Sequence, residues 1–183
     1  MGQHLEALRS GLVEATKDAK LNLQGVLGGG SLSPEQRWGV AVASAIATRN
    51  AALREAVLAD ARAATTEAVV DDAIAAASLM AMNNVYYRFR HMVGHDGYAQ
   101  KRAGLRMNRL VRPATNKLDF ELVCLAVSAI NGCEACIRAH EKVVLEGGLS
   151  DEQIHDAVRI AAVLASVAVS LEASGGGVVE RAA

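Results

Sequence analysis

The sequence predicts an all-α protein whose core is built from small aliphatic side chains. Hydrophobic residues make up 51% of the chain but aromatic residues only 3%, so alanine, valine and leucine must fill the interior. Such side chains suit closely packed helices and would fill a β-sheet poorly. The 183 residues include only two prolines, and apolar positions recur at helical spacing along most of the length. We therefore expect a single all-α domain over residues 1–183.

Composition and charge argue against several classes of protein. A net charge of −1 gives no bulk attraction to nucleic acid or to an anionic membrane. No uninterrupted apolar run reaches the roughly 18 residues that span a bilayer, and the segment Met1–Glu6 lacks the features of a signal peptide. Three cysteines do not make a secreted disulfide framework. We expect a cytoplasmic protein without nucleic-acid or membrane partners, and in a reducing cytoplasm a Cys-x-x-Cys motif is more often catalytic than structural.

Capping residues and periodicity place the helices of the first half. Ser33, Pro34 and Gln36 form a capping box, with serine as the cap and proline at the first helical position. The glycine-rich run 27–31 before it predicts a loop. The helices expected in this half span residues 3–24, 33–48, 51–62 and 66–92.

The second half is expected to follow an irregular linker over residues 94–117. Asn116 is the predicted cap of a helix that runs to Ile130, and Asn131-Gly132 breaks it. A further helix begins near Cys133 and ends at Gly147. Ser150 and Gln153 form a second capping box, which starts the last helix.

The two halves, about 34–93 and 118–174, align without a gap at an offset of 84 residues. Ala41–Ile46 then falls on Leu125–Ile130, and the apolar faces stay in phase, which predicts a duplicated helical unit. The reactive residues of the second half have no reactive counterparts in the first, which indicates that they serve chemistry and not the fold. In this alignment Arg37, Arg49, Ala52 and Ala56 stand opposite Glu121, Cys133, Cys136 and His140.

The candidate site is the run from Asn131 to His140, which holds two of the three cysteines. Because the Asn-Gly pair ends one helix, Cys133 is expected in the first turn of the next, with Cys136 and His140 on the same face. The positive end of a helix dipole favours a thiolate there, and a histidine one turn away can move protons to and from the sulfurs.

Glu121 lies on an otherwise apolar helix, where an unpaired carboxylate is costly. If the two helices pack antiparallel across Asn131-Gly132, Glu121 returns alongside His140 and the pair forms a proton relay. The alternative is a partly exposed glutamate with no role in the site. Cys124 is expected to be an inert core residue, and the aromatic and basic segment 80–91 is expected to pack in the core or at an interface.

A metal site is the main alternative for the two cysteines and the histidine. They supply three ligands, whereas a structural zinc site takes four, and the sequence has no second Cys-x-x-Cys and no Cys-x-His. We expect no bound metal, but a three-ligand zinc site or a thiol-sensor module stays open as an alternative.

The spacing Glu121-x11-Cys133-x2-Cys136-x3-His140 resembles that of alkylhydroperoxidase D (AhpD) proteins, within the carboxymuconolactone-decarboxylase-like superfamily. Some members carry a histidine directly before the second cysteine, whereas this chain has Ala135 there, after Glu134. The resemblance covers nearly the full length and includes Lys20–Leu23, Ala47–Asn50, Met82–Val85, Gly104–Asn108, Phe120–Leu122 and Ala126–Cys133.

The resemblance implies an AhpD-like helical fold, a homotrimer and a thiol-disulfide oxidoreductase of antioxidant defence. Its dithiol would reduce the disulfide of a partner peroxiredoxin of the alkyl hydroperoxide reductase C type, and would reduce peroxides weakly itself. Electrons would come from dihydrolipoamide on a lipoyl-bearing acyltransferase subunit, recharged by dihydrolipoamide dehydrogenase, with no tightly bound cofactor.

The resemblance also implies roles for single residues. Cys136 would attack, Cys133 would complete a disulfide with it, and Glu121 and His140 would relay protons. The helix dipole, by contrast, favours Cys133 as the more acidic thiol. The alternative activity is a decarboxylase-like reaction on a small organic acid.

Overall fold

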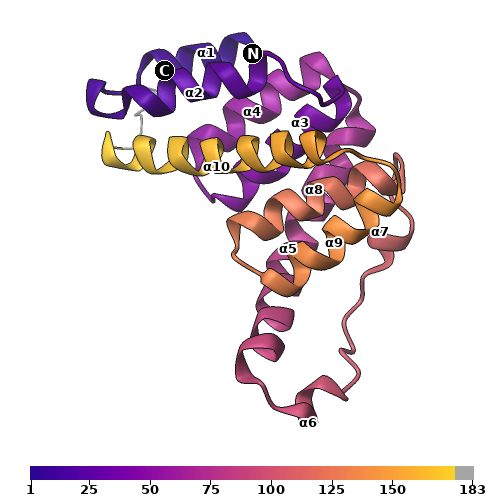
Figure 1. Ribbon diagram of the computed structural model, residues 1–183. Coiled ribbons are helices and arrows are strands. Elements are labelled where there is room, and N and C mark those ends of the chain that lie inside the picture. Colours follow the sequence, from indigo (N-terminus) through magenta and orange to yellow (C-terminus); the bar gives the residue numbers. More distant parts are fainter. Residues whose placement is uncertain (176–183) are drawn as a thin grey trace, which may run out of the picture.

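The computed structural model describes residues 1–175 and shows the predicted all-α fold (Figure 1). No strand occurs among these residues. The elements are α1 Gln3–Ser10, a 3-10 turn Glu14–Thr16, α2 Lys17–Gly28, α3 Pro34–Ala47, α4 Ala51–Ala64, α5 Glu67–Val93, α6 Asp96–Ala99, α7 Asn108–Val111, α8 Lys117–Ile130, α9 Glu134–Glu146 and α10 Asp151–Ala173.

Helix α3 is the centre of the core, since it packs against α4, α5, α8 and α10. Its residues Val40–Ala43 and Ala45 are fully buried. These small side chains let four neighbours approach one helix closely on several sides. The close helix packing that the aliphatic composition predicts is therefore found around α3.

The predicted caps are confirmed. Ser33 with Gln36 and Ser150 with Gln153 form reciprocal capping boxes at the starts of α3 and α10. The Asn116 side chain accepts from the Asp119 backbone N–H at the start of α8. Each bond satisfies a backbone donor that the first turn of a helix leaves unpaired.

The prediction of one helix over residues 3–24 is wrong. Helix α1 ends at Ser10, and the chain turns at Gly11 before the short 3-10 turn and α2. The buried Asp60 carboxylate of α4 accepts from the backbone N–H of Leu5, 2.9 Å away, and holds α1 against α4. Helix α2 packs against α10 instead, so a single straight helix could not make both contacts.

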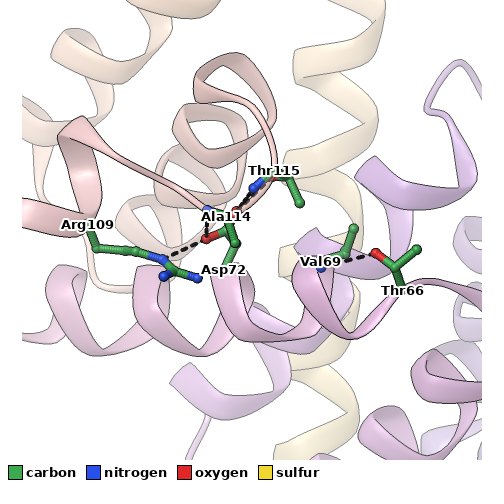
Figure 2. A network of polar contacts seen from close by, with 6 residues as sticks. All are labelled: Thr66, Val69, Asp72, Arg109, Ala114 and Thr115. Carbon is green, nitrogen blue, oxygen red and sulfur yellow. Dashed lines mark hydrogen bonds and ion pairs between the residues drawn. The ribbon is translucent and has the colours of Figure 1, made fainter.

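The linker over residues 94–117 contains two short helices, α6 and α7, which the sequence analysis did not expect. Figure 1 shows α5 extending beyond the other helices, with α6 at its far end and the chain returning toward α8. The buried Asp72 carboxylate fixes the end of the linker to α5 (Figure 2). It accepts from Arg109 Nε at 2.8 Å, from the Ala114 backbone N–H at 2.9 Å, and from the Thr115 backbone N–H and hydroxyl at 2.8 and 2.7 Å.

Helix α10 is long and apolar enough to cross a membrane by length and composition alone. Half of its most apolar stretch is buried within the protein, against α2, α3 and α8. A core helix passes the same test, and its packing identifies α10 as one.

The gapless offset of 84 residues between the halves is wrong for the first two helices of each half. The caps Ser33 and Asn116, and likewise Asn50 and Cys133, lie 83 residues apart, whereas Thr66 and Ser150 lie 84 apart. The structural counterparts of Glu121, Cys133, Cys136 and His140 are therefore Trp38, Asn50, Leu53 and Val57. These four are buried like the residues they match, and none is a thiol, an imidazole or a carboxylate. The duplication itself stays a prediction.

Candidate functional site

The turn between α8 and α9 presents the two cysteines. Gly132 has a φ of 64°, a left-handed conformation that glycine adopts without steric cost. The Cys133 N–H donates to the Ser128 carbonyl and the Gly132 N–H to the Ala129 carbonyl, which is the Schellman pattern of a helix end. Cys133 is the cap residue of α9, just before the first turn in which it was expected.

Glu121 and His140 meet as predicted. His140 Nδ1 donates to Glu121 Oε2 over 2.6 Å, and the two side chains are only 10% and 5% exposed. The alternative of a partly exposed glutamate is therefore wrong. Because the carboxylate occupies Nδ1, it fixes the orientation of the ring and leaves Nε2 as the nitrogen that can exchange a proton.

Cys136 and His140 line one cavity of about 220 Å³. Cys133 is fully buried beside them and does not line it. Helix α5, the linker and α9 form the rest of the wall. Their lining residues are Asn83 and Tyr87 of α5, Met107 and Leu110 of the linker, and Ala135 and Ala139 of α9. The cavity therefore gives a ligand access to one sulfur and to the imidazole together.

Helix α5 supplies polar groups to the site that the sequence analysis missed. Asn84 donates to Ser128 Oγ at 2.9 Å, and Asn131 donates to Asn84 Oδ1 at 2.9 Å. Arg88 donates to the Asn131 carbonyl. These bonds clamp the turn that precedes Cys133. The sequence predicts core or interface packing for this segment, and the signal that could have indicated a role in the site is the pair of adjacent amides with an arginine on the same helix.

Comparisons with known proteins identify the family of the chain. The model of the carboxymuconolactone decarboxylase family matches residues 97–175, which include both cysteines, His140 and Glu121. An alkyl hydroperoxide reductase AhpD of Anaeromyxobacter sp. (strain K) is 65% identical over 179 residues, which cover 98% of this chain and 96% of that protein. The chain belongs to the AhpD family.

More distant AhpD relatives keep the same coverage. The protein of that name from Gluconacetobacter diazotrophicus is 50% identical over 92% of each chain. The one from Azorhizobium caulinodans is 48% identical over 97% of this chain and 98% of its own. The family resemblance stated from the motifs is therefore confirmed.

In this AhpD family member the Cys136 thiol holds its proton tightly. Burial, and next the hydrogen bond with Cys133, raise the pKa of Cys136 to about 12. A hydrogen bond with Asn84 and the positive charge of Arg88 act in the opposite direction. Cys136 thus needs a base to become a nucleophile, and His140 lines the same cavity.

Asn83 is a further polar group in the cavity wall. Its side chain is only 4% exposed, and its Oδ1 has no hydrogen-bond partner among the described residues. The Asn83 backbone carbonyl lies 4.0 Å from the Cys136 sulfur. A buried amide oxygen without a partner is unfavourable, so this group is available to a ligand or water in the cavity.

All three cysteines are free thiols in the structure. The disulfide between Cys133 and Cys136 therefore stays a prediction for the oxidised protein. Cys124 is fully buried, and burial raises its pKa well above the ordinary value, which fits the expected core role. Within residues 1–175, no group of three or more His, Cys, Asp or Glu side chains is placed to hold a metal ion.

Proposed function

We propose that the protein is a cytoplasmic thiol-disulfide oxidoreductase of antioxidant defence, in which Cys133 and Cys136 form the redox-active pair. The observation that carries the proposal is the shared cavity of Cys136 and His140, with His140 held by Glu121. The names of its relatives, alkyl hydroperoxide reductase AhpD, support peroxide metabolism as the setting.

Cys136 is the attacking sulfur in this proposal, because it lines the cavity and Cys133 does not. His140 Nε2 takes the thiol proton, and the Glu121 carboxylate stabilises the imidazolium that results. The thiolate then attacks one sulfur of a peroxiredoxin disulfide. A mixed disulfide forms, and the leaving thiolate takes the proton from His140.

Cys133 completes the reaction by attacking Cys136 in the mixed disulfide. The second partner thiol leaves, Cys133 and Cys136 become a disulfide, and the partner has gained two electrons and two protons. With a peroxide instead, Cys136 takes one oxygen as a sulfenic acid and releases an alcohol. Attack by Cys133 then expels water and gives the same disulfide.

Dihydrolipoamide returns the electrons. One of its thiols attacks the Cys133–Cys136 disulfide, the other resolves the mixed disulfide, and oxidised lipoamide leaves. A lipoyl-bearing acyltransferase subunit would carry this dithiol and dihydrolipoamide dehydrogenase would reduce it again, so the protein would be an alkyl hydroperoxide reductase of the lipoyl-dependent peroxiredoxin class. A homotrimer is the assembly that the family resemblance implies.

A coupled assay tests the proposal. Dihydrolipoamide, its dehydrogenase, NADH and an alkyl hydroperoxide are mixed with the protein, with and without a peroxiredoxin, and NADH oxidation is followed. Peroxide-dependent oxidation should vanish in Cys133→Ser and Cys136→Ser and persist in Cys124→Ser. Full turnover in either of the first two variants would contradict the proposal.

The decarboxylase-like alternative predicts a different pattern. An enzyme acting on a small organic acid does not need both sulfurs, so its activity would survive Cys133→Ser. Metal analysis of protein purified without chelator tests the zinc alternative. About one zinc per chain, with no titratable thiol at the site, would favour it.

A further inference from the structure

A second pocket, of about 430 Å³, lies between the end of α3 and the middle of α5. It shares no lining residue with the cavity of Cys136. Ile46, Ile74 and Val85 give it apolar walls, while Arg49 and Arg88 bring two guanidinium groups. No aspartate or glutamate lines it.

The two arginines have no acidic partner within residues 1–175. Arg88 donates to the Asn131 carbonyl, and the Arg49 side chain has no hydrogen bond or ion pair with any described residue. Two positive charges thus face one pocket without a counter-charge. Guanidinium groups bind planar anions with paired hydrogen bonds, and these bonds are stronger than those between neutral groups.

The backbone of Arg49 gives an independent indication. Its φ is 63°, and it is the one non-glycine residue of the described chain with a positive φ. The matching turn in the second half has Gly132 there, with a φ of 64° and the same backbone hydrogen bond to the residue three before it. A side chain in this conformation costs about 1–2 kcal/mol, which glycine avoids. The strained position points to a role for the arginine side chain itself.

We propose that this pocket binds a small carboxylate with an aliphatic tail. The carboxylate pairs with Arg49 and Arg88, and the tail lies along Ile46, Ile74 and Val85. The pocket volume is of the size that small organic ligands occupy. The apolar walls favour a carboxylate with an aliphatic tail over inorganic phosphate, which has no apolar part. This site does not depend on the proposed redox reaction.

Calorimetry on the full chain tests the site, with octanoate as the probe and octanol and inorganic phosphate as comparisons. Octanoate should bind saturably, and octanol and phosphate at least tenfold more weakly. Arg49→Gly should weaken octanoate binding at least tenfold and leave the melting temperature unchanged or higher, because glycine relieves the backbone strain. Arg54→Gln, which removes an exposed arginine of α4 paired with Glu55, should bind octanoate like the wild type.

Several results would overturn the proposal. They are the absence of saturable octanoate binding, equal binding of octanol or phosphate, and undiminished binding in Arg49→Gly. A lower melting temperature of Arg49→Gly would assign the side chain a structural role instead. A changed oligomeric state in Arg49→Gly, without octanoate binding to the wild type, would assign the arginines to a contact between copies of the chain.

Discussion

Glu121 lies 2.6 Å from His140 Nδ1, although the two residues belong to different helices and are 19 positions apart. Both side chains are buried, so the pair interacts in surroundings with little water to screen it. The antiparallel packing of α8 on α9 brings them together, with the left-handed Gly132 between the helices. The proposed acid–base chemistry of Cys136 depends on this contact.

Removing the base should slow the chemistry of Cys136. His140→Gln is expected to lower the rate of its reaction with peroxide by about 100-fold or more, the usual scale for a lost general base. Glu121→Gln keeps an acceptor for Nδ1 but loses the charge, so we expect a smaller loss of about tenfold. Single-turnover kinetics with pre-reduced protein measure both rates. Glu141→Gln, at an exposed neighbour of His140, should match the wild type. Equal rates in His140→Gln and the wild type would exclude His140 as the base.

The raised pKa of Cys136 predicts an unusual pH profile for its alkylation. Because only the thiolate reacts, the rate with iodoacetamide should keep rising above pH 9 and level off only near the pKa of about 12. In Cys133→Ser the pKa of Cys136 should fall, since Cys133 contributes to raising it, but stay above the ordinary value because burial persists. Mass spectrometry of the alkylated peptide over a pH series gives the profile. A plateau at or below pH 9 in the wild type would contradict this account.

Asp72→Asn should destabilise the protein strongly. The substitution leaves the donors of Arg109, Ala114 and Thr115 with a neutral, weaker partner, and we expect a loss of about 2–4 kcal/mol in urea unfolding. Asp71→Asn is the matched control. Asp71 is the exposed neighbour of Asp72, so this substitution should change the free energy of unfolding by less than about 0.5 kcal/mol.

The same carboxylate predicts a pH dependence of stability. Burial alone would raise the pKa of Asp72, but the donors of Ala114, Thr115 and Arg109 lower it below the ordinary value of 3.8. A depressed pKa stabilises the fold above the unfolded value and loses that effect as the pH falls below it. The stability difference between wild type and Asp72→Asn should therefore shrink on acidification below about pH 4. A difference that stays constant down to pH 2 would show that the charge of Asp72 contributes nothing.

Two adjacent buried asparagines should respond differently to loss of their amides. Asn84→Leu removes the bonds to Ser128 and to the Asn131 side-chain amide, and the Ser128 hydroxyl keeps only its weak contact with the Met80 sulfur, so we expect a cost of about 2–4 kcal/mol. Asn83→Leu removes an oxygen with no partner, so the change should stay within about 1 kcal/mol. Urea unfolding of the two variants measures the contrast. Equal destabilisation would mean that Asn83 has a structural partner, such as a bound water.

The sequence predicted most helix boundaries because caps and turns act locally. Ser33, Asn116 and Ser150 each bond to a backbone N–H three residues ahead, so a short window contains the whole signal. The break at Gly11 was missed because the apolar spacing continues across it. The phase error between the halves arose for a related reason: α3 and α8 are buried on almost every side, so their apolar runs match at either offset, whereas caps and left-handed turns match at only one.

By itself, the sequence determined the all-α class, most helices and the group of Glu121, Cys133, Cys136 and His140, since local spacing and one antiparallel hairpin place them. Only the tertiary structure decided which parts of α5 and the linker complete the site. Asn83, Asn84 and Arg88 lie about 50 residues before the cysteines, and the packing of α5 on α8 and α9 brings them there. That packing also buries Cys136 and raises its pKa. Burial depends on which helices meet in space, and local periodicity does not specify that.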